Sequence, residues 1–115
     1  MFVIESTMDK RLERETAVIR VEGRLDLYAA DTLRGEVQQH VTGGRANLIL
    51  DLAQVDFIDS SGLGAIVGAL KSVRKCGGML RIAALQAQAQ EVMRLTTLDR
   101  VIPTFGSVED ALNTA

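Results

Sequence analysis

Hydrophobic positions follow two periods along this chain, one typical of strands and one typical of helices. Strand patterns occupy five segments: Phe2–Ser6, Ala17–Glu22, Leu48–Leu52, Met79–Ala83 and Val101–Ile102. The run Leu48–Leu52 is apolar almost throughout, which predicts a central strand of a parallel sheet, covered on both faces. Pro103 follows the last segment and confines it to a sheet edge, because proline has no N–H to donate.

Four segments have the spacing of amphipathic helices. The first carries Ala29, Leu33, Val37 and Val41 and stops at Gly43; the second carries Leu63, Ile66, Val67, Leu70 and Val73 and stops at Gly77. Ala87–Leu95 predicts a third helix with Val92 and Leu95 inward, and Ser107 is a predicted N-cap for a fourth that ends near Asn113. The order predicts an α/β fold: a mainly parallel mixed sheet of about five strands, with about four helices. Its first two strands can pair antiparallel.

Composition and charge narrow the class of protein. The chain has 115 residues, 47% of them hydrophobic and 24% charged, which predicts a single globular domain over residues 1–115. A net charge of −2 with 3% aromatic residues argues against direct nucleic-acid binding. No apolar stretch approaches the roughly 20 residues of a membrane span, so we expect no membrane insertion. The single cysteine, Cys76, cannot form an internal disulfide and fits a cytoplasmic location. The charged run Asp9–Glu15 predicts a solvated connection.

The most informative segment is Asp59-Ser60-Ser61-Gly62, which lies between the predicted central strand and the clearest helix. The carboxyl ends of strands are where open α/β sheets bind ligands. One interpretation is structural: an oxygen of Asp59, Ser60 or Ser61 caps the helix by accepting from a free N–H group. The other is that one hydroxyl is phosphorylated at a helix N-terminus rich in donors. The two are compatible.

Enzyme chemistry finds little support in the same residues. The only histidine, His40, falls on the first predicted helix, where a surface or half-buried position is expected, and no G-x-S-x-G motif surrounds the serines. One histidine and one cysteine offer no metal-ligand spacing, and neither a dinucleotide fingerprint nor a phosphate loop is present. We therefore expect no catalytic residues, no metal and no cofactor.

A stripe of small residues follows the second predicted helix. Its members are Ser61, Gly64, Ala65, Gly68, Ala69 and Ser72. Small side chains permit close backbone approach, either to the protein's own sheet or to a partner beside Ser60. Both possibilities stay open, and in either case Leu63, Ile66, Val67 and Leu70 are expected to face the core.

Three segments together resemble a known family. Gly23–Asp26, Leu48–Leu52 and Val55–Gly64 look like the STAS domain, specifically the stand-alone bacterial anti-sigma factor antagonists. Leu98–Asp99 and Val101–Phe105 continue the resemblance, which covers nearly the whole chain. In the family, the residue before the Leu-Asp pair is commonly glycine, whereas this chain has Thr97, which puts the local turn in question.

The resemblance implies partner switching rather than catalysis. An unphosphorylated antagonist binds an anti-sigma factor that is also a serine kinase, which frees the sigma factor; phosphorylation from ATP ends the complex, and a PP2C-type phosphatase restores it. By the family's motif the phosphoacceptor is Ser60, and Asp26, Asp59, Ser61, Gly62 and Leu63 would lie at the docking surface.

Two other classes of function remain as alternatives. The first is a non-switching STAS accessory subunit of a phospholipid-transport ATPase, in which the same helix end is a fixed docking surface. The second is a sensor of a nucleotide or other small molecule, for which the sequence gives little support.

Overall fold

The computed structural model describes residues 3–9 and 16–113, and side chains from residue 16 onward. Its sheet has the order β1-β2-β3-β4-β5, with β1 antiparallel to β2 and the other neighbours parallel. The strands are β1 (Val3–Asp9), β2 (Thr16–Leu25), β3 (Asn47–Ile58), β4 (Met79–Ala83) and β5 (Thr104–Phe105). The helices are α1 (Leu27–Thr42), α2 (Ser60–Lys75), α3 (Ala87–Leu95) and α4 (Val108–Leu112), with a 3-10 turn η1 (Leu98–Arg100). The predicted α/β fold and the antiparallel first pair are confirmed.

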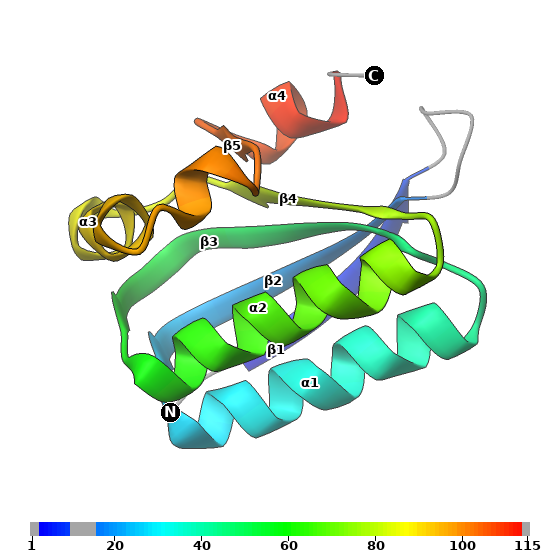
Figure 1. Ribbon diagram of the computed structural model, residues 1–115, viewed down its shortest axis with the longest axis horizontal. Helices are drawn as coiled ribbons and strands as arrows, with labels where there is room; N and C mark the ends of the chain where they lie inside the picture. Colours follow the sequence, from blue (N-terminus) through cyan, green and yellow to red (C-terminus); the bar gives the residue numbers. More distant parts are fainter. Residues whose placement is uncertain (1–2, 10–15, 114–115) are drawn as a thin grey trace.

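Helices α1 and α2 lie side by side on one face of the sheet, and α4 lies on the other (Figure 1). The chain passes from β2 through α1 to β3, and then through α2 to β4, moving across the sheet in one direction. Such crossovers between parallel strands are right-handed, so both helices must cover the same face. Phe2 and the connection from residue 10 to residue 15 lie outside the described residues.

Strand β3 is the centre of the core, as its apolar run predicts. Leu48, Leu50 and Leu52 are fully buried in the cluster that includes α1 and α2. Ile49 points to the opposite face, where it packs with residues of α4. A strand covered on both faces needs apolar side chains at consecutive positions, which is why its sequence shows no alternation.

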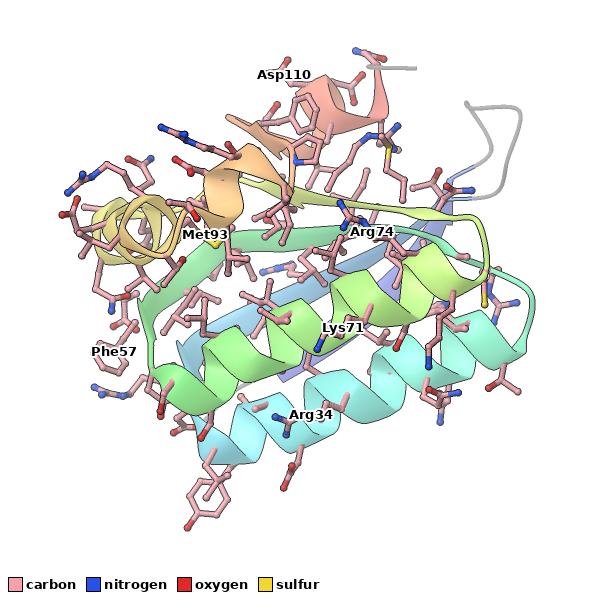
Figure 2. All side chains as sticks on the ribbon, viewed as in Figure 1. Arg34, Phe57, Lys71, Arg74, Met93 and Asp110 are labelled. Atoms are coloured by element: carbon pink, nitrogen blue, oxygen red, sulfur yellow. The ribbon has the colours of Figure 1, made fainter. Side chains whose placement is uncertain are left out.

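Small residues of α2 face both the core and the neighbouring helix. Ala65 and Ala69 are buried, while a side chain at Gly64 would approach the Arg34 guanidinium of α1 at 3.6 Å. Figure 2 places Arg34 of α1 beside α2. The expectation for the larger residues is partly confirmed: Ile66 and Leu70 are buried, whereas Leu63 and Val67 are only half-buried.

The inward face of α3 differs from the prediction. Ala89 and Met93 are buried, Val92 is half-buried, and Leu95 is 66% exposed. The predicted inward pair of Val92 and Leu95 is therefore wrong. Ala89 and Met93 are separated by four residues and share one helix face, and the packing of α3 against β3 decides which face turns inward.

The last strand begins later than predicted. β5 is Thr104–Phe105, where Thr104 pairs with Ile82 and Phe105 with Ala83. Val101 instead ends the 3-10 turn and is exposed, while Ile102 is buried. Pro103 contributes its carbonyl to the edge by accepting from the Ile82 N–H at 3.0 Å. Of this apolar pair, Ile102 alone is anchored in the core, and the strand itself follows the proline.

Histidine 40 is buried rather than half-buried or exposed, with 7% of its surface accessible. Its Nδ1 accepts a hydrogen bond from Arg45 Nε at 3.1 Å, and its Nε2 has no partner among the described residues. Burial, reinforced by the positive charge of Arg45, lowers the pKa of His40 below its usual 6.5, against a smaller raising effect of Glu36. The folded protein thus holds this ring neutral.

Acidification should consequently weaken folding through His40. As the pH falls below about 6.5, the unfolded chain takes up a proton on this ring more readily than the folded chain does, so stability present at neutral pH is lost. The free energy of unfolding from urea titrations at pH 7.5 and 5.5 should fall, and fall less in His40→Gln, which does not titrate. An equal decrease in both proteins would contradict this account.

Thr97 adopts a left-handed backbone conformation at the end of α3, with φ of 58°. The turn before Leu98-Asp99 therefore forms without glycine. The Arg100 N–H donates to the Thr97 carbonyl at 3.1 Å at the start of η1. A β-branched side chain is strained in this region, where glycine is not. The preceding Thr96 has ordinary right-handed dihedrals, and its hydroxyl donates to the Val92 carbonyl at 2.7 Å.

Relief of this strain is measurable. We expect Thr97→Gly to raise the free energy of unfolding by about 1 kcal/mol, the relieved strain exceeding the entropy added to the unfolded chain. The matched control Thr96→Gly should lower it by about 1 kcal/mol, because it removes the hydrogen bond to the Val92 carbonyl and adds backbone freedom at a C-cap residue with right-handed dihedrals. Denaturant titration of both variants checks the pair; a Thr97→Gly protein no more stable than the parent would show that the turn carries no strain.

Candidate functional site

Two helix N-termini lie next to each other at the carboxyl edge of the sheet. β2 and β3 are parallel neighbours that end at the same level, because Leu25 pairs with Ile58. Each strand is followed immediately by an aspartate that caps the next helix. Asp26 accepts from the Tyr28 and Ala29 N–H groups at 3.1 and 3.2 Å, and Asp59 accepts from the Gly62 N–H at 2.9 Å. Of the three predicted capping candidates for α2, Asp59 is the one that caps.

Gly62 allows α2 to begin directly against the end of β2. A Cβ atom at this position would lie 2.2 Å from the Leu25 carbonyl oxygen and 2.8 Å from Leu25 Cγ. The Asp59 N–H also donates to that carbonyl at 3.3 Å. Any side chain at Gly62 would push the helix off the strand, so this glycine serves close packing.

The two serines differ in their exposure. Ser60 is the first residue of α2 and is exposed, Ser61 is half-buried, and Leu63 is half-buried against the core. Because Asp59 caps the helix, neither hydroxyl is needed for capping. In the described part of the chain, no acceptor is found for the Ser60 and Ser61 N–H groups, which remain at the positive end of the helix dipole.

The structure thus brings together the six residues singled out from the sequence. Asp26 and Asp59 begin the paired helices, and residues 60–63 form the first turn of α2. The two aspartates supply negative charge at this edge, and the helix N–H groups supply an opposing positive field. Such a surface can hold a small anionic group and can present one hydroxyl to a partner.

Sequence reasoning missed the apolar and aromatic rim of this site. Leu27 and Tyr28, at the start of α1, are 55% and 74% exposed. The Arg24 guanidinium lies 4.3 Å from the centre of the Phe57 ring, and Figure 2 shows Phe57 at the end of β3 near the start of α2. Leu27 and Tyr28 are apolar residues that lie outside the i, i+4 stripe beginning at Ala29. Their position off the core-facing stripe is the signal from which their exposure could have been predicted.

A glutamine of α3 also reaches this region. Gln88 Oε1 accepts from the Ile58 N–H at 2.9 Å, and Gln88 Nε2 donates to the Ile58 carbonyl at 3.0 Å. Ile58 directly precedes Asp59. The contact joins residues 30 positions apart in sequence, and a glutamine in a helix carries no signal from which it could have been foreseen.

Away from this edge, the described residues form fewer arrangements that could bind a ligand or react. A hollow of about 520 Å³ lies between the turn of residues 43–47 and that of residues 76–78, at the opposite end of β3 from Ser60. Cys76 is a free, exposed thiol there. Across the described ranges, no three histidine, cysteine or acidic side chains gather as a metal ion would need. Nor does any helix within them combine the length and the apolar character needed to cross a bilayer.

Comparison with known proteins agrees with the geometry. The family model of the STAS domain matches residues 7–111. The anti-sigma-B factor antagonist of Bacillus subtilis (strain 168) is 30% identical over 95 residues, which cover 83% of this chain and 86% of the relative. The crystal structure of an anti-sigma factor antagonist from Mycobacterium paratuberculosis has a TM-score of 0.79 at 24% identity, covering 96% of this chain and 92% of that one.

A second solved structure is that of the Bacillus cell fate determinant SpoIIAA in the phosphorylated form. It has a TM-score of 0.73 at 23% identity and covers 95% of this chain and 97% of its own. The fold, the paired helix N-termini and the match of the family model over residues 7–111 lead to one conclusion: this chain belongs to the STAS domain family.

Proposed function

We propose that this protein is an anti-sigma factor antagonist controlled by phosphorylation of Ser60. The observation that carries the proposal is the position of this residue: an exposed hydroxyl at the first residue of α2, directly after the capping Asp59. The family's phosphoacceptor occupies the same place in the Asp-Ser-Ser-Gly motif. The curated relative from Bacillus subtilis, named an anti-sigma-B factor antagonist, supports the antagonist role.

In this proposal the unphosphorylated protein binds an anti-sigma factor serine kinase and so frees the sigma factor. The docking surface comprises Asp26, Asp59, Ser61, Gly62 and Leu63 around Ser60. The kinase transfers the γ-phosphoryl group of ATP to Ser60 Oγ, which loses its proton, and ADP is released. A PP2C-type phosphatase later hydrolyses the phosphate ester and returns the hydroxyl. The protein acts in the cytoplasm as the regulated partner, without catalysis of its own.

Electrostatics supports the release step. A phosphate carries a charge of about −1.5 to −2 at neutral pH. On Ser60 it would follow directly after Asp59, at the sheet edge where Asp26 caps the neighbouring helix, in an interface fitted to a neutral hydroxyl. Repulsion and desolvation then oppose docking, while the Ser60 and Ser61 N–H groups stabilise the phosphate on the free protein. A change of about 1.4 kcal/mol already alters the affinity tenfold.

The site of modification can be tested with single substitutions. The purified protein is incubated with ATP and each anti-sigma factor kinase homologue encoded in the source genome, and the product is analysed by mass spectrometry. We expect one phosphate on the parent protein and on Ser61→Ala, and none on Ser60→Ala. Phosphate found only on Ser61 would overturn the assignment. A parent protein that no such kinase modifies, and that co-purifies from its cells with a transporter ATPase, would instead indicate the non-switching accessory subunit.

The charge mechanism can be separated from a steric one. Ser60→Glu adds a carboxylate to the first turn of α2, and Ser60→Gln adds a neutral side chain of the same size. By calorimetric titration with the kinase identified above, we expect Ser60→Glu to weaken binding at least about tenfold, or about 1.4 kcal/mol, and Ser60→Gln to weaken it less. Equal weakening by the two substitutions would favour steric exclusion over charge.

A further inference from the structure

Strand β3 is supported unequally on its two edges. On the β2 side its pairing continues to Ile58, whereas on the β4 side the last pair is Asp51 with Ala83. Within the described ranges, no strand pairs with residues 52–58 on that edge. Figure 1 shows this part of β3 curving away from β4 towards the start of α2.

Two glutamines at the start of α3, the N-cap Gln86 and the helical Gln88, bond to this unsupported edge. Gln86 Nε2 donates to the Ala53 carbonyl at 2.8 Å, and Gln88 bonds to both the N–H and the carbonyl of Ile58 at 2.9 and 3.0 Å. In a strand, the N–H and carbonyl of one residue point to the same edge. A side-chain amide carries the same donor and acceptor as a peptide group. Gln88 thus makes the two hydrogen bonds that a neighbouring strand would make at Ile58.

Ile58, to which Gln88 bonds, is the residue directly before Asp59, the N-cap of α2. Ile58 is only 2% exposed, so its side chain is fixed in the core while Gln88 fixes its backbone. The next residue, Asp59, donates its N–H to Leu25 and accepts from Gly62. Gln88 itself is carried by a helix whose Ala89 and Met93 are fully buried. A continuous set of contacts therefore runs from α3 through Ile58 and Asp59 to the first turn of α2.

We propose that Gln88 is a positioning residue for Ser60. Its amide holds the end of β3 so that Asp59 caps α2 in one geometry and the Ser60 hydroxyl is presented to the kinase in one orientation. The functional part of this inference rests on the proposed phosphorylation of Ser60; the structural part does not.

The structural part is tested without a partner. Gln88→Met keeps the length of the side chain but removes both hydrogen bonds, and Gln86→Met is the matched control at the N-cap of the same helix. By nuclear magnetic resonance, amide hydrogen exchange at Ile58 and Gly62 should quicken about tenfold in Gln88→Met, for two lost hydrogen bonds, and stay near the parent rate in Gln86→Met. Parental exchange at both amides in Gln88→Met would overturn the positioning role.

The functional part is tested with the kinase that modifies the parent protein. We expect kcat for phosphorylation of Gln88→Met to fall about tenfold, because a misplaced hydroxyl slows transfer, while KM changes less than about twofold because the docking side chains remain. Gln86→Met should have both constants near the parent values. Gln88→Glu, which still accepts from the Ile58 N–H, should recover part of the loss. Unchanged kcat in Gln88→Met would overturn the presentation role, whereas absent phosphorylation of the parent would count against the proposed function itself.

Discussion

The contact between Gly62 and the Leu25 carbonyl is the constraint on which the rest of the site depends. It exists because β2 and β3 end at the same level, so that the helix after β3 begins against the last residue of β2. Two capping aspartates and two helix N-termini are thereby placed side by side. With a larger residue at this position, the first turn of α2 could not pack on β2, and the paired N-termini would separate.

At this edge of the sheet, Asp59 caps helix α2, and the neighbouring Ser60 has the exposed hydroxyl. Asp59 accepts from the Gly62 N–H and sets the start of the helix, and the Ser60 hydroxyl makes no hydrogen bond to another residue that the structure describes. Under the proposed phosphorylation, Ser60 would gain and lose a charged group without the loss of the Asp59 cap. The rim formed by Leu27, Tyr28 and the Arg24–Phe57 pair adds exposed apolar and aromatic area beside it. Exposed apolar and aromatic area of this kind is typical of protein surfaces that become buried when a partner binds.

The sheet is incomplete on the side of β4, and the C-terminal part of the chain compensates for it. The last pair with β4 lies seven residues before the end of β3, and side-chain amides at the start of α3 replace ladder bonds at Ala53 and Ile58. Without Gln88, the buried N–H and carbonyl of Ile58 would lack hydrogen-bond partners, at a cost of about 1–3 kcal/mol each. The start of α3 therefore both covers part of the core and supplies hydrogen bonds to the strand that carries the candidate site.

Most of the elements and the motif can be predicted from the chain alone, because both depend on local periods and short spacing. The apolar run at Leu48–Leu52, the helix over Leu63–Val73 and the Asp-Ser-Ser-Gly segment can each be recognised within a few residues. Three features depend on distant partners and follow only from the packed fold: the burial of Met93 rather than Leu95, the burial of His40, and the hydrogen bonds of Gln88 to Ile58. A helix presents several similar faces, and a polar side chain many possible partners, so the choice is made by packing between segments that lie far apart in the chain.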